Sequence, residues 1–433
     1  MRRVATALLA LFVLTAIPFA LPRLAAACGG CFAPTGTPNI VTAHRMAVSL
    51  SATETTLWDQ IQYAGAPADF VWVLPVAPGV EVQLADNAFF ESLAQGTQLN
   101  LIAPLPPTPC FCASGGGFGC GSAGDSAPPS AYRPSDAGVT VYYEGSIGPY
   151  ETATIGSGDP MALIDWLQAH GYGVPDAILP TIAHYTDLGL AFAVLRLRPN
   201  AGVQQMQPVR ITMPGLSPTF PLRMVAAGAT AELALELYVF AEGRSETMNM
   251  PTLELDRAAI TYDWTAGTFD YDARFDAALA AAGGRAWIVE YAGALPSNVP
   301  YYSSFDPDGT PHTTTADLAV VRRGLPGVLN LTKLRTRMAA SLLDQDLVLG
   351  AAATDAELGT QINVTHELHR AADTDCTSVC GGGPSEFDGC SVESSKHDAE
   401  SARDRGLPLG LALLFVPAAA LLSRRLRRSA RSR

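Results

Sequence analysis

Alternating hydrophobic and polar positions mark out several strands along the first half of the chain. Residues 44–50 alternate with a period of two, which is typical of a strand with one buried face. The apolar run 70–74 ends at Pro75 and predicts a fully buried strand. We expect four further strands, at residues 139–143, 192–197, 209–213 and 233–240.

Helical spacing of apolar residues is confined to a few short segments. The clearest begins with an Asp-Pro pair at residue 159, suited to an N-cap and a first helical position, and ends at Gly171. We expect other helices at residues 86–94, 273–282 and 329–343. The pattern therefore predicts an α+β fold, in which a predominantly antiparallel β-sheet carries several packed helices.

Both ends of the chain carry hydrophobic stretches of a different kind. Residues 1–27 begin with Met-Arg-Arg, continue with an apolar run and end in Ala-Ala-Ala, which predicts a secretory signal cleaved after Ala27. Residues 406–423 are uncharged and precede the arginine-rich tail 424–433. This predicts a single C-terminal membrane-spanning helix with its tail in the cytoplasm. The same features fit a sorting signal that is removed at the cell surface, so retention and cleavage both stay open.

The chain between these ends divides into two parts. Residues 28–350 form the expected ectodomain, either as one unit or as two β-rich subdomains. Residues 351–405 become polar and rich in Gly, Ser and acidic residues, which predicts a stalk between ectodomain and membrane. We therefore expect an exported, membrane-anchored protein of the cell envelope, located in the periplasm or exposed at the surface.

Charge is distributed unevenly along the 433 residues, whose net charge is -13. All 41 acidic residues lie between Glu54 and Asp404, whereas nine of the 28 basic residues lie in the two ends. So acidic an ectodomain repels phosphate backbones, which argues against nucleic acid as a partner and favours cations or a basic envelope protein. The segment from Asp306 to Gly309 resembles half of a calcium loop, although a simple turn has the same composition.

Eight cysteines, an even number, are expected to form disulfides in an exported chain. A redox pair at Cys28 and Cys31 would need a following helix to lower a thiol pKa, and none is predicted there. The spacing in the Gly-rich loop 104–136 is too irregular for a zinc site. Cys28 would also be the first mature residue, where lipid attachment is an alternative. The disulfide candidates are Cys28, Cys31, Cys110, Cys112, Cys120, Cys376, Cys380 and Cys390.

A series of short segments, taken in order, resembles one known family. They lie at residues 27–34, 44–46, 61–75, 148–150, 165–172, 221–223 and 331–337, and include Cys28-Gly-Gly-Cys31 and Gly148-Pro-Tyr150. Together they resemble the exported bacterial family called domain of unknown function 2330 (DUF2330), over about residues 28–350. The extra cysteines are similar to those of a myxobacterial branch. The resemblance implies an envelope protein without an established activity, so it supplies no site residues.

Local catalytic motifs are weak. Ser146 and Ser157 lack the glycine two positions earlier that a nucleophile elbow requires. His366 and His369 are three residues apart, not the four of the zinc-protease helix, and we read them as solvated. We therefore assign no catalytic, cofactor or metal residue and expect a non-enzymatic binding or structural ectodomain. The alternative is an envelope hydrolase or thiol redox enzyme whose site is assembled across the fold.

Overall fold

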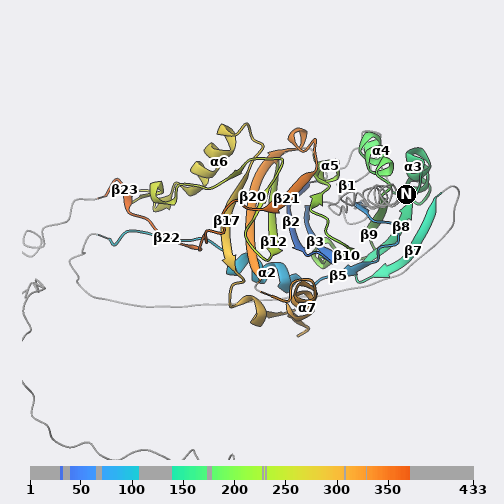
Figure 1. Cartoon of the computed structure of the whole chain (residues 1–433), viewed down its shortest axis with the longest axis horizontal. Coiled ribbons are helices and arrows are strands. Elements are labelled where there is room, and N and C mark those ends of the chain that lie inside the picture. Colours follow the sequence, from blue (N-terminus) through green and yellow to red (C-terminus); the bar gives the residue numbers. More distant parts are fainter. Residues whose placement is uncertain are drawn as a thin grey trace, which may run out of the picture. The chain divides into compact units, whose positions relative to one another are not determined.

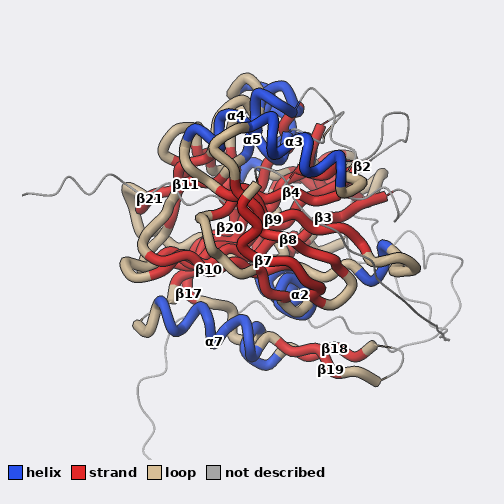
Figure 2. Tube along the Cα trace, turned by 90° about the vertical axis from the view of Figure 1, so that its right-hand side faces the viewer, coloured by secondary structure: helices blue, strands red, loops and turns tan. Residues whose placement is uncertain are grey.

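In the computed structural model the chain forms two compact units, residues 1–379 and 380–433, and all the described residues lie in the first. Two β-sheets lie face to face, with helices on their outer faces (Figure 2). The described residues are 30–32, 40–64, 71–106, 139–172, 178–226, 229, 232–306, 309–327 and 329–370.

The larger sheet has eight strands (Figure 1). Strands β2 and β12 run parallel, whereas the pairs β2–β3, β3–β10 and β12–β20 are antiparallel. The order is β14 (Thr252–Leu253), β17 (Trp287–Ala294), β20 (Asn330–Ala339), β12 (Glu232–Ala241), β2 (Ile40–Leu50), β3 (Glu54–Ala64), β10 (Val209–Pro214) and β5 (Val82–Leu84).

The second sheet has five strands, all paired in antiparallel fashion, and separates two hydrophobic clusters. In β9, Ala193 and Leu195 pack between the two sheets, whereas Phe192 and Val194 face the helices. This alternation follows from the period of two of a strand. The order is β1 (Gly30–Phe32), β4 (Val71–Val76), β9 (Ala191–Leu197), β8 (Tyr150–Gly156) and β7 (Thr140–Ile147).

The outer faces of both sheets are covered by helices, with α3 and α4 on the five-stranded sheet and α2 and α7 on the eight-stranded sheet (Figure 2). Asp86 and Asp159 cap α2 and α3 by accepting the N–H groups of Ala88 and Met161. The helices are α2 (Asn87–Gly96), α3 (Pro160–Ala169), α4 (Leu179–Asp187), α5 (Leu222–Ala226), α6 (Tyr271–Ala281) and α7 (Thr315–Gly324).

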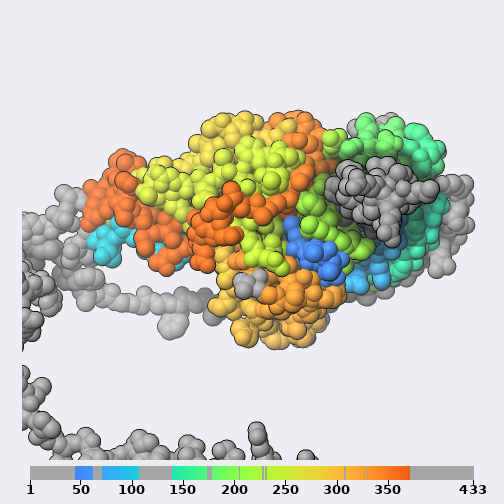
Figure 3. All heavy atoms as spheres, in the orientation of Figure 1, coloured from blue at the N-terminus to red at the C-terminus, as the bar shows by residue number. Residues whose placement is uncertain are grey.

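Short strands complete the described region. The C-terminal strands β22 and β23 pair with β6 and β15, which are far earlier in the sequence (Figure 3). The short strands form small sheets of two or three strands. These are β22 (Gln361–Asn363) with β6 (Asn100–Ile102), β16 (Thr268–Phe269) with β15 (Thr261–Asp263) and β23 (His366–Leu368), β11 (Thr219–Phe220) with β21 (Leu347–Ala351) and β13 (Ser245–Thr247), and β18 (Ser303–Phe305) with β19 (Pro311–Thr313).

The α+β class and the dominance of antiparallel sheet are confirmed, but the helix predicted over residues 329–343 is wrong. This segment is largely strand β20, paired with β12 and β17. Its true period is two, because Leu334 and Met338 face the core between the sheets while Lys333 and Arg335 point to the other face. The basic side chains look solvated in the sequence, yet they are paired with acids from neighbouring strands.

Several expectations concern residues outside those described. They include the signal 1–27, the segments 406–423 and 424–433 and seven of the eight cysteines; of Cys31 only the backbone, in β1, is described. The expected disulfides and membrane-spanning helix therefore stay predictions. Within the described residues, no helix combines the length and apolar character that crossing a bilayer requires.

A buried carboxylate holds α6 to the eight-stranded sheet. A β-bulge in β17 directs Glu290 toward β20, and its side chain is only 2% exposed. One carboxylate oxygen accepts bonds from Tyr271 (2.8 Å) and Arg335 (2.7 Å), and the other lies 2.9 Å from Lys333 Nζ. Burial alone would raise the pKa of Glu290, but the two cations outweigh it and hold that pKa below its ordinary value.

We expect Glu290→Gln to destabilise the protein by about 3 kcal/mol, because it leaves buried cations without their partner. The control is Glu232→Gln on β12, an exposed residue, which should change stability by less than about 0.5 kcal/mol. Urea unfolding followed by tryptophan fluorescence measures both. Equal effects of the two substitutions would contradict this role for Glu290.

Candidate functional site

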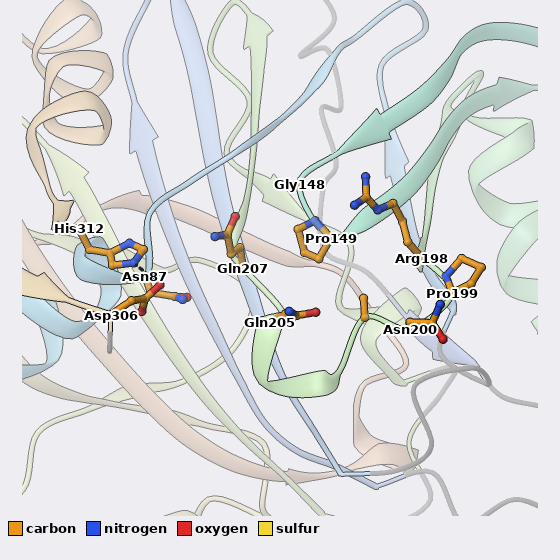
Figure 4. Close-up of a pocket in the computed structure, with 11 residues that line it drawn as sticks. Asn87, Gly148, Pro149, Arg198, Pro199, Asn200, Gln205, Gln207, Asp306 and His312 are labelled. Carbon is orange, nitrogen blue, oxygen red and sulfur yellow. Dashed lines mark ion pairs between the residues drawn. The ribbon is translucent and has the colours of Figure 1, made fainter. Parts of the chain in front are cut away.

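A polar cavity of about 380 Å³ lies where the turns of the five-stranded sheet meet β10 and the start of α2 (Figure 4). It is walled by the β7–β8 turn, the turn after β9, the segment leading into β10, and the β18–β19 hairpin. The lining residues are Asn87, Gly148, Pro149, Arg198, Pro199, Asn200, Ala201, Gln205, Gln207, Asp306 and His312.

The Gly148-Pro149-Tyr150 segment fixes one wall. Gly148 has a φ of 47°, in the left-handed region that favours glycine, and a Cβ there would meet the side chain of Leu84. Tyr150 is fully buried, and its hydroxyl donates to the carbonyl of Gln207 (2.7 Å) and accepts the N–H of the same residue (2.9 Å). These two bonds tie the five-stranded sheet to the segment before β10.

The turn after β9 forms the adjacent wall. The Arg198 N–H donates to the Pro149 carbonyl (2.9 Å), and the Ala201 N–H donates to the Arg198 carbonyl (2.9 Å). Asn200 has a φ of 73°, in the left-handed region that few residues other than glycine occupy. The neighbouring 3₁₀ turn (Val203–Gln205) is closed by the Gln205 side chain, which accepts the Gly202 N–H (3.1 Å). The backbone is therefore held in place around the cavity.

The guanidinium of Arg198 has no ion pair with a carboxylate among the described residues, and its Nε is buried without a hydrogen-bond partner there. By contrast, Arg210 is 2.7 Å from Asp317, and Arg196 is 2.6 Å from Glu151. A guanidinium that is half-buried and unpaired carries a desolvation cost that an anionic ligand would remove.

A histidine between two carboxylates lies at the opposite end of the cavity (Figure 4). His312 Nδ1 is 3.0 Å from Asp86, and its Nε2 is 3.0 Å from Asp306. The contact with Asp306 is the main cause that raises the pKa of His312, and Asp86 adds to it against the opposing effect of burial. The three charged groups together carry one net negative charge while His312 is protonated. Both ring nitrogens face carboxylates, which suits a cation and not a general base.

Amide side chains occupy the space between these two ends (Figure 4). Gln205 and Gln207 lie between Arg198 on one side and His312 on the other, and Asn87 lies beside His312. None of the described lining residues carries a hydroxyl, a thiol or an amine. The arrangement can bind a polar ligand, and its described lining supplies no hydroxyl or thiol nucleophile.

Comparison with protein families gives one match. The model of the family described as "Uncharacterized protein conserved in bacteria (DUF2330)" matches residues 22–314. The chain belongs to this family. No curated protein and no solved structure matches the chain.

The match to DUF2330 confirms the resemblance stated from the sequence, and every lining residue of the cavity lies within the matched range. One of the segments that carried the resemblance, Gly148-Pro149-Tyr150, builds the wall described above. Another, His44-Arg-Met46, places His44 in a buried pair with Asp59 between β2 and β3. That pair does not line the cavity described above.

The residues weighed for chemistry from the sequence lie apart from one another in this DUF2330 chain. Ser146 is exposed on β7, and Ser157 accepts the N–H of Asp159 (3.0 Å) at the start of α3. His369 is exposed and contacts Asp263 at 3.1 Å. No group of three His, Cys, Asp or Glu among the described residues is placed to hold a metal ion.

The segment considered for calcium forms a turn in the part that is described. The Gly309 N–H donates to the Asp306 carbonyl (2.8 Å), and the Asp306 side chain faces His312. Asp308 lies outside the described residues. Calcium binding at this segment therefore stays a prediction.

Sequence reasoning missed Arg198, Gln207 and His312. Arg198 follows β9, Gln207 precedes β10 and His312 lies on β19, and no local motif links them. The sequence did contain one signal, the Gly148-Pro149-Tyr150 segment, which was part of the family resemblance. Its role as a wall of the cavity was not predicted.

We expect His312 to make stability pH-dependent. The pKa of His312 is higher in the folded protein than in the unfolded chain, where it is about 6.5. The stabilisation that protonated His312 provides is therefore complete below pH 6.5 and is lost as the pH rises through the folded-state pKa. His312→Gln should therefore lower the melting temperature at pH 5.5 more than at pH 9. The control His366→Gln, at an exposed position on β23, should show no such difference. A pH-independent effect of His312→Gln would contradict the assignment.

Proposed function

We propose that this protein is an exported, membrane-anchored binding protein of the cell envelope, and that its ligand is a polar anion held in the cavity beside Arg198. The observation that carries the proposal is the unpaired guanidinium in a cavity lined by amides. Arginine binds carboxylate and phosphate groups in a planar, two-bond geometry. A volume of about 380 Å³ is in the range of small-molecule sites.

The location rests on the two ends of the sequence. The apolar run before Cys28 ends in three alanines, and the arginine-rich tail follows an uncharged segment of membrane-spanning length. These features favour an ectodomain outside the cytoplasm, where the eight cysteines would be oxidised. Membership of the family described as conserved in bacteria is consistent with this location.

An envelope hydrolase is the second candidate, and the contact between His312 and Asp306 in the cavity favours it. A His and a carboxylate at a cavity form part of many hydrolytic sites. The first proposal is stronger, because the second carboxylate, Asp86, occupies the other ring nitrogen. Mass spectrometry of the ligand after prolonged incubation separates the two: recovery of unchanged ligand supports binding alone, and release of a cleaved product supports hydrolysis.

We expect Arg198→Gln to weaken binding of small carboxylates roughly 10- to 100-fold, the effect of losing a charge-assisted hydrogen bond. Isothermal titration of the full chain in detergent with succinate, and with its neutral analogue succinamide, measures this. The matched control is Arg322→Gln in the last turn of α7, for which no ion pair is found among the described residues. Equal succinate binding by wild type and Arg198→Gln would contradict the proposal.

We also expect fractionation of the native cells to recover the mature chain with membranes, starting at Cys28. Alkylation before and after reduction should then show that the cysteines are crosslinked. An intact, uncleaved chain in the cytosol, or eight free thiols in the exported protein, would contradict the proposed location.

A further inference from the structure

We propose that the ligand is a short peptide with free ends, bound with its carboxylate at Arg198 and its ammonium group at Asp306. This inference rests on the proposed binding function and names its ligand class. It follows from the placement of opposite charges at the two ends of one cavity (Figure 4).

The carboxylate end is set by Arg198. Pro149 and Pro199 lie beside Arg198 and have no side-chain acceptor, so neither pairs with the guanidinium, and a ligand carboxylate can supply the acceptor. The backbone on both sides of Arg198 is fixed by its bonds to Pro149 and Ala201. A peptide carboxylate fits this fork geometry without requiring the turn to move.

The ammonium end is set by Asp306. His312 balances only one of the two carboxylates that contact it, and Asp86 is further engaged by the N–H groups of Ala88 and Thr313. The negative charge that His312 does not balance therefore lies at Asp306, whose side chain is 57% exposed. An ammonium group carries three donors and complements this site.

The middle of the cavity suits peptide groups. Gln207 presents both a donor and an acceptor, as a peptide bond does, whereas the side-chain oxygen of Gln205 accepts the Gly202 N–H and leaves its amide N–H groups as donors. The oxygen of Asn87 accepts from Gln60 (3.1 Å), which leaves the amide N–H groups of Asn87 as donors. No Phe, Tyr or Trp is found among the described lining residues, so a stacking platform of the kind that sugars use is lacking there.

Isothermal titration of the full chain in detergent with three peptides tests the inference. The peptides are trialanine, N-acetyl-trialanine, which lacks the ammonium group, and trialanine amide, which lacks the carboxylate. Wild type should bind trialanine at least about 10-fold more tightly than either capped peptide, since each loses a charged contact.

Two variants assign the ends. Arg198→Gln should bind trialanine and trialanine amide equally, and Asp306→Asn should bind trialanine and N-acetyl-trialanine equally. Each variant should retain its preference at the other end, which shows that the cavity is still folded. Arg322→Gln should behave as wild type.

Two results would overturn the inference: equal binding of capped and free peptides by wild type, or no binding of trialanine. Either result is distinguishable from failure of the proposed function, because succinate binding that depends on Arg198 would persist. Loss of that dependence as well would remove both proposals.

Discussion

The hydroxyl of Tyr150 joins the two stacked sheets, and the cavity owes its shape to that junction. Tyr150 begins β8 of the five-stranded sheet, and its two bonds to Gln207 reach the segment that leads into β10 of the other sheet. A buried hydroxyl has to find partners, so these bonds fix the distance between the two elements. The β7–β8 turn and the turn after β9 are held around the same point. The cavity therefore forms between connecting segments that hydrogen bonds hold at the edge of the two sheets.

Two charged groups, at Glu290 and at Arg198, differ in whether the fold itself supplies their partners. Glu290 receives bonds or ion-pair contacts from Tyr271, Arg335 and Lys333, so its cost of burial is offset within the fold. Arg198 has no such partner among the described residues. A satisfied network stabilises packing, whereas an unsatisfied cation beside a cavity leaves binding energy for a ligand. That contrast is why we place the function at Arg198.

Local signals predicted the elements that local chemistry determines. The Asp-Pro pair at residue 159 predicted α3 correctly, because capping depends only on neighbouring residues. Strand β20 was mistaken for a helix because Lys333 and Arg335 pair with Glu290 of the adjacent strand β17, which is more than 40 residues earlier in the sequence, so no local window reveals the pairing. The cavity was not predicted for the same reason. Arg198 and His312 line one cavity only because the sheet topology brings their segments together.

The most direct test of the account is the NMR signal of the Arg198 side chain. With arginine-selective ¹⁵N labelling of the full chain in detergent, and the Arg198→Gln spectrum as assignment, the Nε–H resonance can be followed as succinate is added. We predict a saturable shift of this resonance, because a carboxylate bound to the guanidinium changes the electronic environment of the Nε–H. A resonance that does not move while other arginine signals do would contradict the claim that Arg198 holds the ligand.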